Sequence, residues 1–287
     1  MLRPAIEGDA ARIDAFLAPM TETSLFLRGN LARHGLFNRD HPHGTAYFLW
    51  EEEGAIRAVF GCTNGGFLLC QAPDAPGAFW AALPVALEGR RVLGMTGLAG
   101  QVEQTISALK IPQDAIILNN LEPLYVLDFG DLVLPAKADT RPATKDDLPL
   151  LERWFSGYIA DTEPQFPAGQ IAERAGATAQ RAVDIADTRL LTEHGTPLAM
   201  AAVLSRADDT VQVGAVYVPP SHRGAGRGGA VVAAHMADLR AKEGVQKAVL
   251  FAHNPTAARA YERIGFRRIG TARIIRLSSP WKVTPCP

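Results

Sequence analysis

The order of polar and apolar positions in the second half of the chain predicts strands first and helices afterwards. Residues 187–218 form three apolar runs of strand length, separated by polar turns at His194-Gly195 and Asp208-Asp209. The segment "AVVAAHMADLRAKEG" (230–244) then has apolar residues three and four positions apart. This spacing predicts a helix that ends at Gly244.

Three further elements are predicted after this helix. They are a short buried strand at 247–252, a helix that begins at Asn254-Pro255, and a last strand near 267–277. The first half of the chain has a similar density of strand and helix signals. Meandering strands followed by a strand–helix–strand crossover are typical of a mixed α/β fold.

Two stretches of the chain resemble each other. "RPAIEGDAARIDAF" (3–16) and "RPATKDDLPLLERW" (141–154) lie 138 positions apart, and Arg, Pro, Ala and Asp recur in register. Each pattern predicts a short strand, an acidic helix start and an amphipathic helix. The separation is close to half of the chain, so we predict a duplication. The expected domains are 1–134 and 141–287, joined by a polar linker, "PAKADT" (135–140).

Composition narrows the class of protein. A chain of 287 residues with 47% hydrophobic residues can bury two cores, and its 29 basic and 30 acidic residues nearly balance. The balance argues against nucleic acid or an anionic membrane as a partner. No apolar run is long enough for a membrane span and no signal peptide is evident, so a cytoplasmic location is expected. Three cysteines, Cys62, Cys70 and Cys286, are too few and too scattered for a disulfide framework.

The loop "VPPSHRGAGRGGA" (218–230) lies between a predicted strand and a predicted helix. Backbone amides at a helix start, exposed by glycines, form an anion site. A dinucleotide fingerprint fits Gly224, Gly226 and Gly229, but five residues separate the strand from these glycines. A nucleotide P-loop lacks its Lys-Ser/Thr pair. A third interpretation is the diphosphate loop of an acyl-CoA transferase, with an arginine three residues before two spaced glycines.

On these residues the sequence resembles the GNAT superfamily of acyl-CoA-dependent N-acyltransferases. Arg223, Gly226 and Gly228 match its R-x-x-G-x-G loop, and "HNPTAARAYERIGFRRIG" (253–270) matches a second landmark of Asn, Tyr and Gly-Phe. The specific match covers roughly 210–275. The resemblance implies two tandem GNAT-like α/β (α+β) domains, each with a mixed, mostly antiparallel sheet flanked by helices. The N-terminal domain would be a degenerate copy.

The resemblance also implies acetyl-CoA as acyl donor and a set of residues that bind it. Strand-end amides near Val216 and Val218 would contact the pantetheine, and the glycine-loop amides and two arginines would contact the diphosphate. Ala257 and Ala258, in the helix that begins at Asn254-Pro255, are small enough to leave room for the pantetheine between this helix and the glycine-loop helix. The expected binding residues are Val216, Tyr217, Val218, Arg223, Gly224, Ala225, Gly226, Arg227, Gly228, Gly229, Asn254, Ala257, Ala258 and Tyr261.

Tyr261 is the expected general acid, which would protonate the departing thiolate. It follows Asn254 by seven positions, about two helical turns, so both lie on one face of the helix. Each has a structural alternative as well: Asn254 before Pro255 is a good N-cap, and Tyr261 fits a core aromatic. Gly265-Phe266 would stop the helix and anchor the core.

An amine acceptor, a small molecule or a peptide, must be deprotonated, because few alkyl amines are neutral at pH 7. Many members of the superfamily place a glutamate on the central strand, where this chain has Gln212. Asp161, Glu163 and His253 are the alternative candidates for a base.

The first half offers weaker signals. Arg91, Gly94 and Gly97 in "GRRVLGMTGLAGQ" have a looser spacing than the second-half loop, and no Asn, Tyr and Gly-Phe landmark follows. This half is expected to be a scaffold. His41 and His43 lack a third ligand at suitable spacing, so no metal site is predicted.

The sequence therefore favours an N-acetyltransferase that acts as a monomer or homodimer. Two alternatives remain at this point: a non-catalytic acyl-CoA-binding sensor or scaffold, and a dinucleotide-dependent oxidoreductase.

Overall fold

The chain forms two compact units in the computed structural model, which describes residues 1–135 and 139–284. The first unit comprises Met1–Glu122 and a C-terminal segment that begins at Gly270. The second unit comprises Pro123–Ile269. The chain thus passes from one unit to the other twice.

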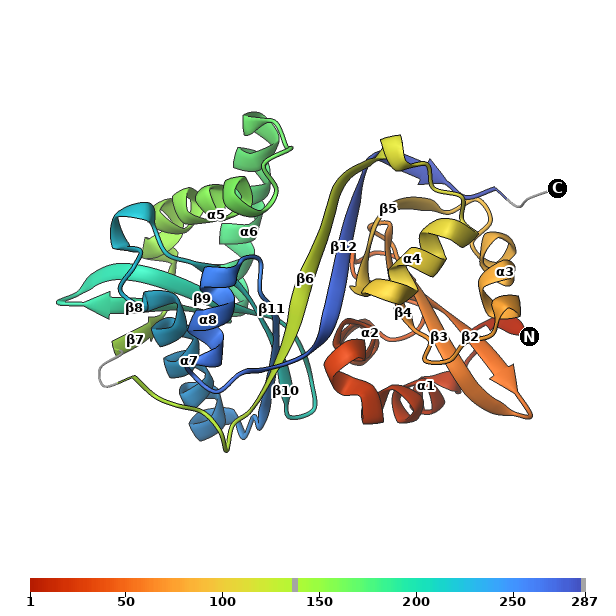
Figure 1. Cartoon of the computed structure of the whole chain (residues 1–287), viewed down its shortest axis with the longest axis horizontal. Helices are drawn as coiled ribbons and strands as arrows, with labels where there is room; N and C mark the ends of the chain where they lie inside the picture. The colour runs from red at the N-terminus through yellow and green to blue at the C-terminus, as the bar shows by residue number, and fades with distance from the viewer. Residues whose placement is uncertain (136–138, 285–287) are drawn as a thin grey trace. The chain divides into compact units, whose positions relative to one another are not determined.

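These boundaries differ from the single linker predicted at 135–140, which would have given domains 1–134 and 141–287. Residues 136–138 of that segment lie outside the described residues, and its last two residues belong to strand β7 (Asp139–Pro142). The crossings occur within two long strands, β6 (Ile116–Asp128) and β12 (Arg267–Lys282), which can be followed in Figure 1. A strand is held by backbone pairing and apolar contacts, so no polar linker marks these crossings.

The described part of the first unit contains four α-helices among its strands. Its helices are α1 (Asp9–Leu17), α2 (Thr21–His34), α3 (Gly77–Ala86) and α4 (Ala99–Ala108), with short 3₁₀ turns at Ala18–Met20 and Gln113–Ala115. Besides β12 and the start of β6, its strands are β1 (Leu2–Pro4), β2 (Thr45–Glu52), β3 (Ala55–Thr63), β4 (Phe67–Gln71) and β5 (Arg91–Leu98).

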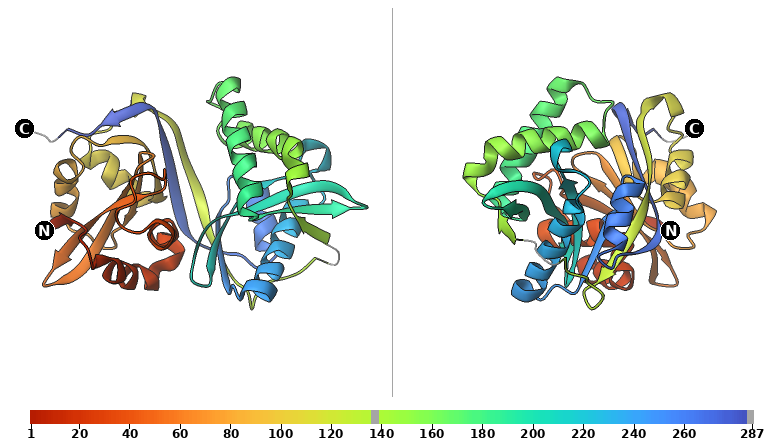
Figure 2. Two further views of the ribbon diagram at one scale, coloured as in Figure 1. Left: turned by 180° about the vertical axis from the view of Figure 1, so that it is seen from behind. Right: turned by 60° about the vertical axis from the view of Figure 1, so that its left-hand side comes forward.

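The α-helices and strands of the second unit follow one another in the same order as those of the first. Figure 2 shows the ribbon from two further sides. Its helices are α5 (Leu148–Thr162), α6 (Ala168–Ile185), α7 (Arg227–Glu243) and α8 (Pro255–Glu262), with 3₁₀ turns at Lys145–Asp147 and Pro220–His222. Besides β7 and the end of β6, its strands are β8 (Thr188–Glu193), β9 (Thr196–Ala207), β10 (Thr210–Tyr217) and β11 (Lys247–Phe251). The turns, helices and strands predicted for residues 187–277 are confirmed.

Both units have the same strand topology. The order is β1-β2-β3-β4-β5-β12 in the first unit and β7-β8-β9-β10-β11-β6 in the second. In each, the fourth and fifth strands are parallel and the other pairs are antiparallel. The last strand comes from the other half of the sequence: β12 pairs with β5, and β6 pairs with β11. The predicted mixed, mostly antiparallel α/β architecture is therefore confirmed, with an exchange of the closing strands.

Apolar side chains fill both faces of each sheet. In the second unit, one cluster packs beneath α7 and α8 and another beneath α5 and α6. The first unit repeats this arrangement with α3 and α4 on one face and α1 and α2 on the other. Cys62 and Cys70 are buried in the α3/α4 cluster, as expected for core residues, and burial raises the pKa of both thiols. Cys286 lies outside the described residues.

The repeated Arg-Pro segment makes the same contacts in both units, which supports the predicted duplication. Arg3 Nη1 donates to Asp9 Oδ2 at 2.6 Å, and Arg141 Nη1 donates to Asp147 Oδ2 at 2.7 Å. Each aspartate also accepts a backbone N–H three residues before it. The aspartate therefore closes the turn between the first strand and the first helix. The Arg141 guanidinium lowers the pKa of Asp147 to about 2.

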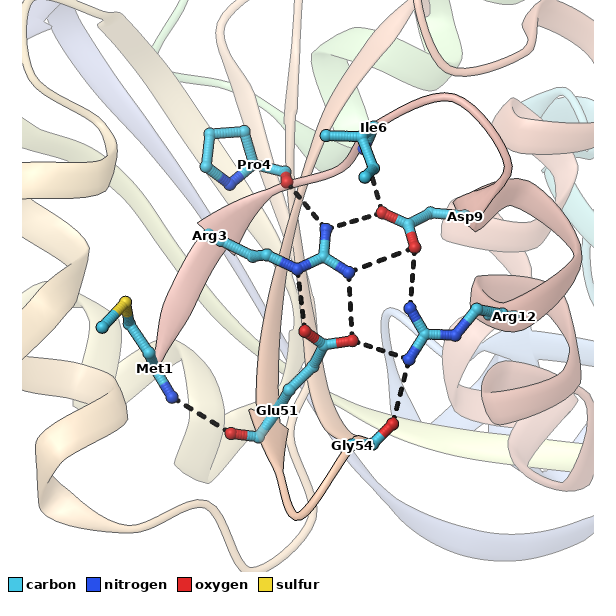
Figure 3. Close-up of polar contacts among 8 residues, drawn as sticks. All are labelled: Met1, Arg3, Pro4, Ile6, Asp9, Arg12, Glu51 and Gly54. Atoms are coloured by element: carbon cyan, nitrogen blue, oxygen red, sulfur yellow. Dashed lines mark hydrogen bonds and ion pairs between the residues drawn. The ribbon is translucent and has the colours of Figure 1, made fainter.

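The first unit extends this pair into a network of four charges (Figure 3). Glu51 accepts from Arg3 Nε at 2.7 Å and from Arg12 Nη2 at 2.7 Å, and Arg12 Nη1 also donates to Asp9 at 2.8 Å. These bonds lower the pKa values of Asp9 and Glu51. The network ties the start of α1 to the hairpin of β2 and β3.

No helix within the described residues combines the length and the apolar character needed to cross a membrane.

His235 on α7 gives the fold a dependence on pH. Its side chain is 2% exposed, and burial, followed by repulsion from Arg189, lowers its pKa to about 3. Its Nδ1 has no hydrogen-bond partner among the described residues. Because the unfolded chain takes up this proton near pH 6.5 and the folded chain does not, stability is lost as the pH falls below about 6.5.

We expect the free energy of unfolding to fall by about 1.4 kcal/mol between pH 7.5 and 5.5 through this group alone. Urea unfolding of the parent protein and of His235→Gln at both pH values measures the effect. The variant should lose less stability than the parent by that amount. An equal loss in both proteins would contradict the assignment.

Candidate functional site

The pairing between the parallel strands β10 and β11 ends before β10 reaches the glycine loop. Their register pairs Thr210–Gln212 with Lys247–Val249, whereas β10 continues to Tyr217. In the part of the chain that the structure describes, the end of β10 therefore extends beyond its ladder with β11. The strand-end backbone near Val216 and Val218, which the sequence predicted to contact the pantetheine, thus lies beyond the pairing with β11.

A bulge in β10 directs two of the predicted binding residues toward the glycine loop. Ala215 has a φ of +47°, and the register with β9 shifts between Gly214 and Tyr217. An extra residue in a strand turns the following side chains to the opposite face. Val216 and Val218 consequently pack against the cluster beneath α7 and α8.

Tyr217 points to the other face of the sheet. Its ring packs 6.3 Å from that of Trp154, and a Cβ at Gly157 would lie 2.2 Å from its hydroxyl oxygen. Its side chain belongs to the cluster beneath α5 and α6. Of the three strand residues predicted to bind the donor, the side chain of Tyr217 therefore lies apart from those of Val216 and Val218, and only its backbone shares their edge.

The glycine loop enters α7 through left-handed residues. Gly224 has a φ of +87° and Gly226, the N-cap, a φ of +70°, which L-residues with a Cβ adopt at a cost. A Cβ at either position would meet no atom within 4 Å, and Ala225 between them is exposed. The first helical bond runs from Ala230 N–H to the Gly226 carbonyl at 3.1 Å. The amides before it, at the anion-binding end of the helix, are those of Arg227, Gly228 and Gly229.

Gly228 and Gly229 have different surroundings. A Cβ at Gly228 would lie 3.7 Å from Val218 Cγ2, so this residue faces the end of β10. A Cβ at Gly229 would lie 3.1 Å from the carbonyl oxygen of Ala260 in α8. The lack of a side chain at Gly229 is therefore explained by close packing of α7 on α8, while its amide belongs to the first turn.

Both loop arginines contact protein groups. Arg223 Nε donates to the Val218 carbonyl at 2.9 Å, and Arg223 Nη2 donates to Asp161 at 2.6 Å. Arg227 donates to the His222 carbonyl at 2.9 Å and lies 3.7 Å from Glu193. These contacts hold the loop against the strand end and α5. The sequence predicted phosphate contacts and gave no indication of these ion pairs, because the partners are far apart along the chain.

Of the base candidates, the structure places Asp161 next to the glycine loop. Its carboxylate is half exposed and joins Arg223 at the C-terminal end of α5. Glu163 instead pairs with Arg174 at 2.9 Å. His253 is exposed just before α8, and Gln212 is buried at 3% exposure within β10.

Asn254 is the N-cap of α8. Its Oδ1 accepts the Ala257 N–H at 2.9 Å, and Pro255 occupies the first helical position. We expect Asn254→Ala to lower the free energy of unfolding by about 1 kcal/mol, as loss of a cap usually does. Asn254→Asp keeps the cap and removes the amide donor, so normal stability together with a weaker affinity for acetyl-CoA in that variant would reveal a second role in binding. An unchanged stability of Asn254→Ala, measured in urea, would contradict the capping role.

Tyr261 lies on the buried face of α8. It is 6% exposed, and its ring is 6.0 Å from that of Phe266. Ala257 and Ala258 are partly buried against the same cluster. The helix ends at Glu262, and Gly265, the predicted helix stop, follows three residues later with a φ of +104°. The structure thus gives Tyr261 the packing of a core aromatic, next to Ala260, whose carbonyl oxygen faces Gly229 in the first turn of α7.

The first unit lacks a counterpart of the glycine loop. Residues 72–76 connect β4 to α3, where 218–226 connect β10 to α7. The glycines that the sequence singled out, Gly94 and Gly97, lie with Arg91 within strand β5. These glycines belong to a strand and not to a loop, in line with the weak signal that the sequence gave here. A Cβ at Gly94 would lie 2.4 Å from the Ile275 carbonyl oxygen.

Three histidines cluster in the first unit, and the sequence analysis singled out only His41 and His43. The ring of His34 stacks on that of His41 at 4.1 Å, and the rings of His41 and His43 are 5.5 Å apart. Burial and His41 lower the pKa of His34. Within residues 1–135 and 139–284, no group of three or more His, Cys, Asp and Glu side chains is arranged to hold a metal ion.

Comparisons with known proteins agree with this arrangement. Residues 191–275, which contain the loop, α7, β11 and α8, match the family model of FR47-like proteins. A comparison with curated protein sequences gave no match. Solved structures match nearly the whole chain. A GCN5-related N-acetyltransferase from Kribbella flavida is 20% identical with a TM-score of 0.56, covering 96% of this chain and 97% of its own.

Two further structures extend the comparison. A GNAT-family acetyltransferase from Colwellia psychrerythraea is 13% identical with a TM-score of 0.52, covering 97% of this chain and 100% of its own. A Drosophila protein is 15% identical with a TM-score of 0.66, covering 96% and 98%. The chain has the GNAT fold. At this level of identity the structures show the fold alone.

The GNAT fold decides between two interpretations of the glycines. A dinucleotide fingerprint belongs to a parallel, doubly wound sheet, whereas the strand pairs within each unit are mostly antiparallel. The oxidoreductase alternative is therefore abandoned. The FR47-like match and the GNAT fold together support an acyl-transfer function in general terms.

Proposed function

We propose that the second unit transfers an acetyl group from acetyl-CoA to an amine. The observation that carries the proposal is the left-handed glycine entrance to α7 beside the point where β10 and β11 part. The open space at Gly224 and Gly226 fits a bound diphosphate, because a side chain at either would fill it. The chemistry that acetyl-CoA supplies is an activated thioester.

The amides of the first turn would bind the diphosphate. Those of Arg227, Gly228 and Gly229 point to the same end of α7, and charge-assisted bonds of this kind contribute about 1.5–3 kcal/mol each. The helix dipole adds a positive end at the same place. The backbone at Val216–Val218 would bond the pantetheine as a neighbouring strand does. The small side chains of Ala257 and Ala258 would leave room for the pantetheine between α7 and α8.

The amine nitrogen would attack the thioester carbonyl carbon, forming a C–N bond as the C–S bond breaks. The leaving thiolate then needs a proton, and we assign its donation to the Tyr261 hydroxyl. The attacking amine must lose a proton, and Asp161 is the candidate carboxylate nearest the loop. The acceptor belongs to the class of small-molecule or peptide amines.

A second candidate function is a sensor that binds acyl-CoA without turnover. It is favoured by Gln212, which stands where a catalytic carboxylate would otherwise lie and is buried. An amide cannot accept the proton of the amine.

Release of free thiol from acetyl-CoA in the presence of a panel of amines separates the two functions. The proposal expects amine-dependent release, with one acetylated amine formed per thiol. Tight binding of acetyl-CoA without thiol release across the panel would favour the sensor. Absence of binding would overturn both.

A further inference from the structure

The first unit contains a strand edge equivalent to the proposed donor site. Its parallel strands β4 and β5 pair at Phe67–Gly94 and Leu68–Met95, and β4 continues beyond the pairing to Gln71. α4 follows β5 directly, with Leu98 at the N-cap, as α8 follows β11 with Asn254 at the N-cap. The end of β4 thus corresponds to the end of β10, where we place the pantetheine.

Gln101 occupies this edge. It lies three residues after the N-cap of α4 and is 9% exposed. In the orientation of its amide that satisfies both groups, Nε2 donates to the Cys70 carbonyl at 3.0 Å and Oε1 accepts the Ala72 N–H at 3.3 Å. One side-chain amide therefore bonds to two alternate residues of one strand edge, as the backbone of a neighbouring strand would.

The positions correspond between the units. Cys70 and Ala72 belong to the cluster beneath α3 and α4, and Val216 and Val218 pack against the cluster beneath α7 and α8. Counted from the helix N-caps, Gln101 corresponds to Ala257, the small residue expected to leave room for pantetheine. Where the second unit has the small side chain of Ala257, the first unit has a side-chain amide.

Two other differences point the same way. The connection at 72–76 contains Pro73 and Pro76, which have no N–H to donate, and its length does not accommodate the loop of the second unit. Seven residues after the N-cap, where α8 has Tyr261, α4 has Thr105, which is buried and donates to the Gln101 carbonyl at 2.8 Å.

We propose that Gln101 fills, in the first unit, the strand edge that acyl-CoA takes in the second, so that each chain binds one acyl-CoA. This rests on the proposed function of the second unit. The first unit does not fit an acyl-CoA, and its own side chain satisfies the strand end that a ligand would otherwise bond.

Titration calorimetry with acetyl-CoA tests the number of sites. We expect one site per chain, and Gly226→Val in the second unit should weaken its affinity about 10–100-fold. Two sites, or one site whose affinity Gly226→Val leaves unchanged, would overturn the proposal. No binding at all would instead contradict the proposed function. Failure of this proposal and failure of the proposed function are therefore distinguishable.

Hydrogen exchange at the Ala72 amide tests Gln101 itself without any ligand. Gln101→Met fills a similar volume without the two bonds, and we expect exchange at Ala72 to become about ten-fold faster. Gln101→Ala should show the same. Gln104→Ala, at an exposed glutamine of the same helix, is the matched control and should leave the amide unchanged. Unchanged exchange in both Gln101 variants would overturn the assignment.

Discussion

Replacing Tyr261 with phenylalanine is expected to lower kcat for acetyl transfer about 10²–10⁴-fold, the usual contribution of a positioned general acid. The Kd for acetyl-CoA should change by less than about two-fold, because phenylalanine keeps the ring that packs against Phe266. Only the hydroxyl that would protonate the thiolate is lost. Steady-state kinetics and calorimetry on the same preparation measure both quantities.

Tyr47→Phe is the matched control. Tyr47 is 2% exposed, and its hydroxyl donates to the Leu27 carbonyl at 2.8 Å in the first unit. Removing that hydroxyl should cost about 1 kcal/mol of stability and leave kcat unchanged. If Tyr261→Phe behaves in the same way, with reduced stability and normal turnover, Tyr261 is a core aromatic and not the acid.

Replacing Gly226 with valine is expected to raise the Kd for acetyl-CoA about 10–100-fold. The valine side chain would enter the open space at the N-cap of α7 and keep the diphosphate from one or two amides. The left-handed backbone, with φ +70° and ψ +8°, adds a stability cost of about 1–2 kcal/mol that is independent of any ligand.

Gly244→Val separates these two effects. Gly244 caps the other end of the same helix with φ +69° and ψ +15°, and a Cβ there also meets nothing within 4 Å. Both variants should lose similar stability in urea, while only Gly226→Val loses affinity. A normal Kd in Gly226→Val would remove the diphosphate from this loop. Equal losses of affinity in both variants would assign the effect to α7 as a whole.

Local features of the second unit could be predicted from the sequence because short-range chemistry determines them. Gly244 ends α7 in a left-handed conformation, and Asn254 with Pro255 begins α8, as their positions indicated. The hairpin turns at His194-Gly195 and Asp208-Asp209 likewise require residues that tolerate a positive φ. The arginine and aspartate that recur in both halves could be found in the sequence. The structure shows that they form an equivalent ion pair in each unit.

Features that depend on distant residues could not be predicted. The exchange of β6 and β12 needs only apolar, strand-forming residues, so either half of the chain can supply the closing strand. The Arg223–Asp161 pair joins residues 62 positions apart. Nothing in the sequence pointed to a role for Gln101, because a glutamine near a helix start is usually exposed. The glycines of β5 could be set aside as a loop only by their spacing, because strand packing and anion binding both select glycine.

A crystal structure of the protein with acetyl-CoA tests the central claim most directly. The account predicts the diphosphate within hydrogen-bonding distance of the first-turn amides of α7, and the sulfur facing the Tyr261 hydroxyl. A diphosphate bound in the first unit, or a Tyr261 hydroxyl turned away from the sulfur, would contradict it.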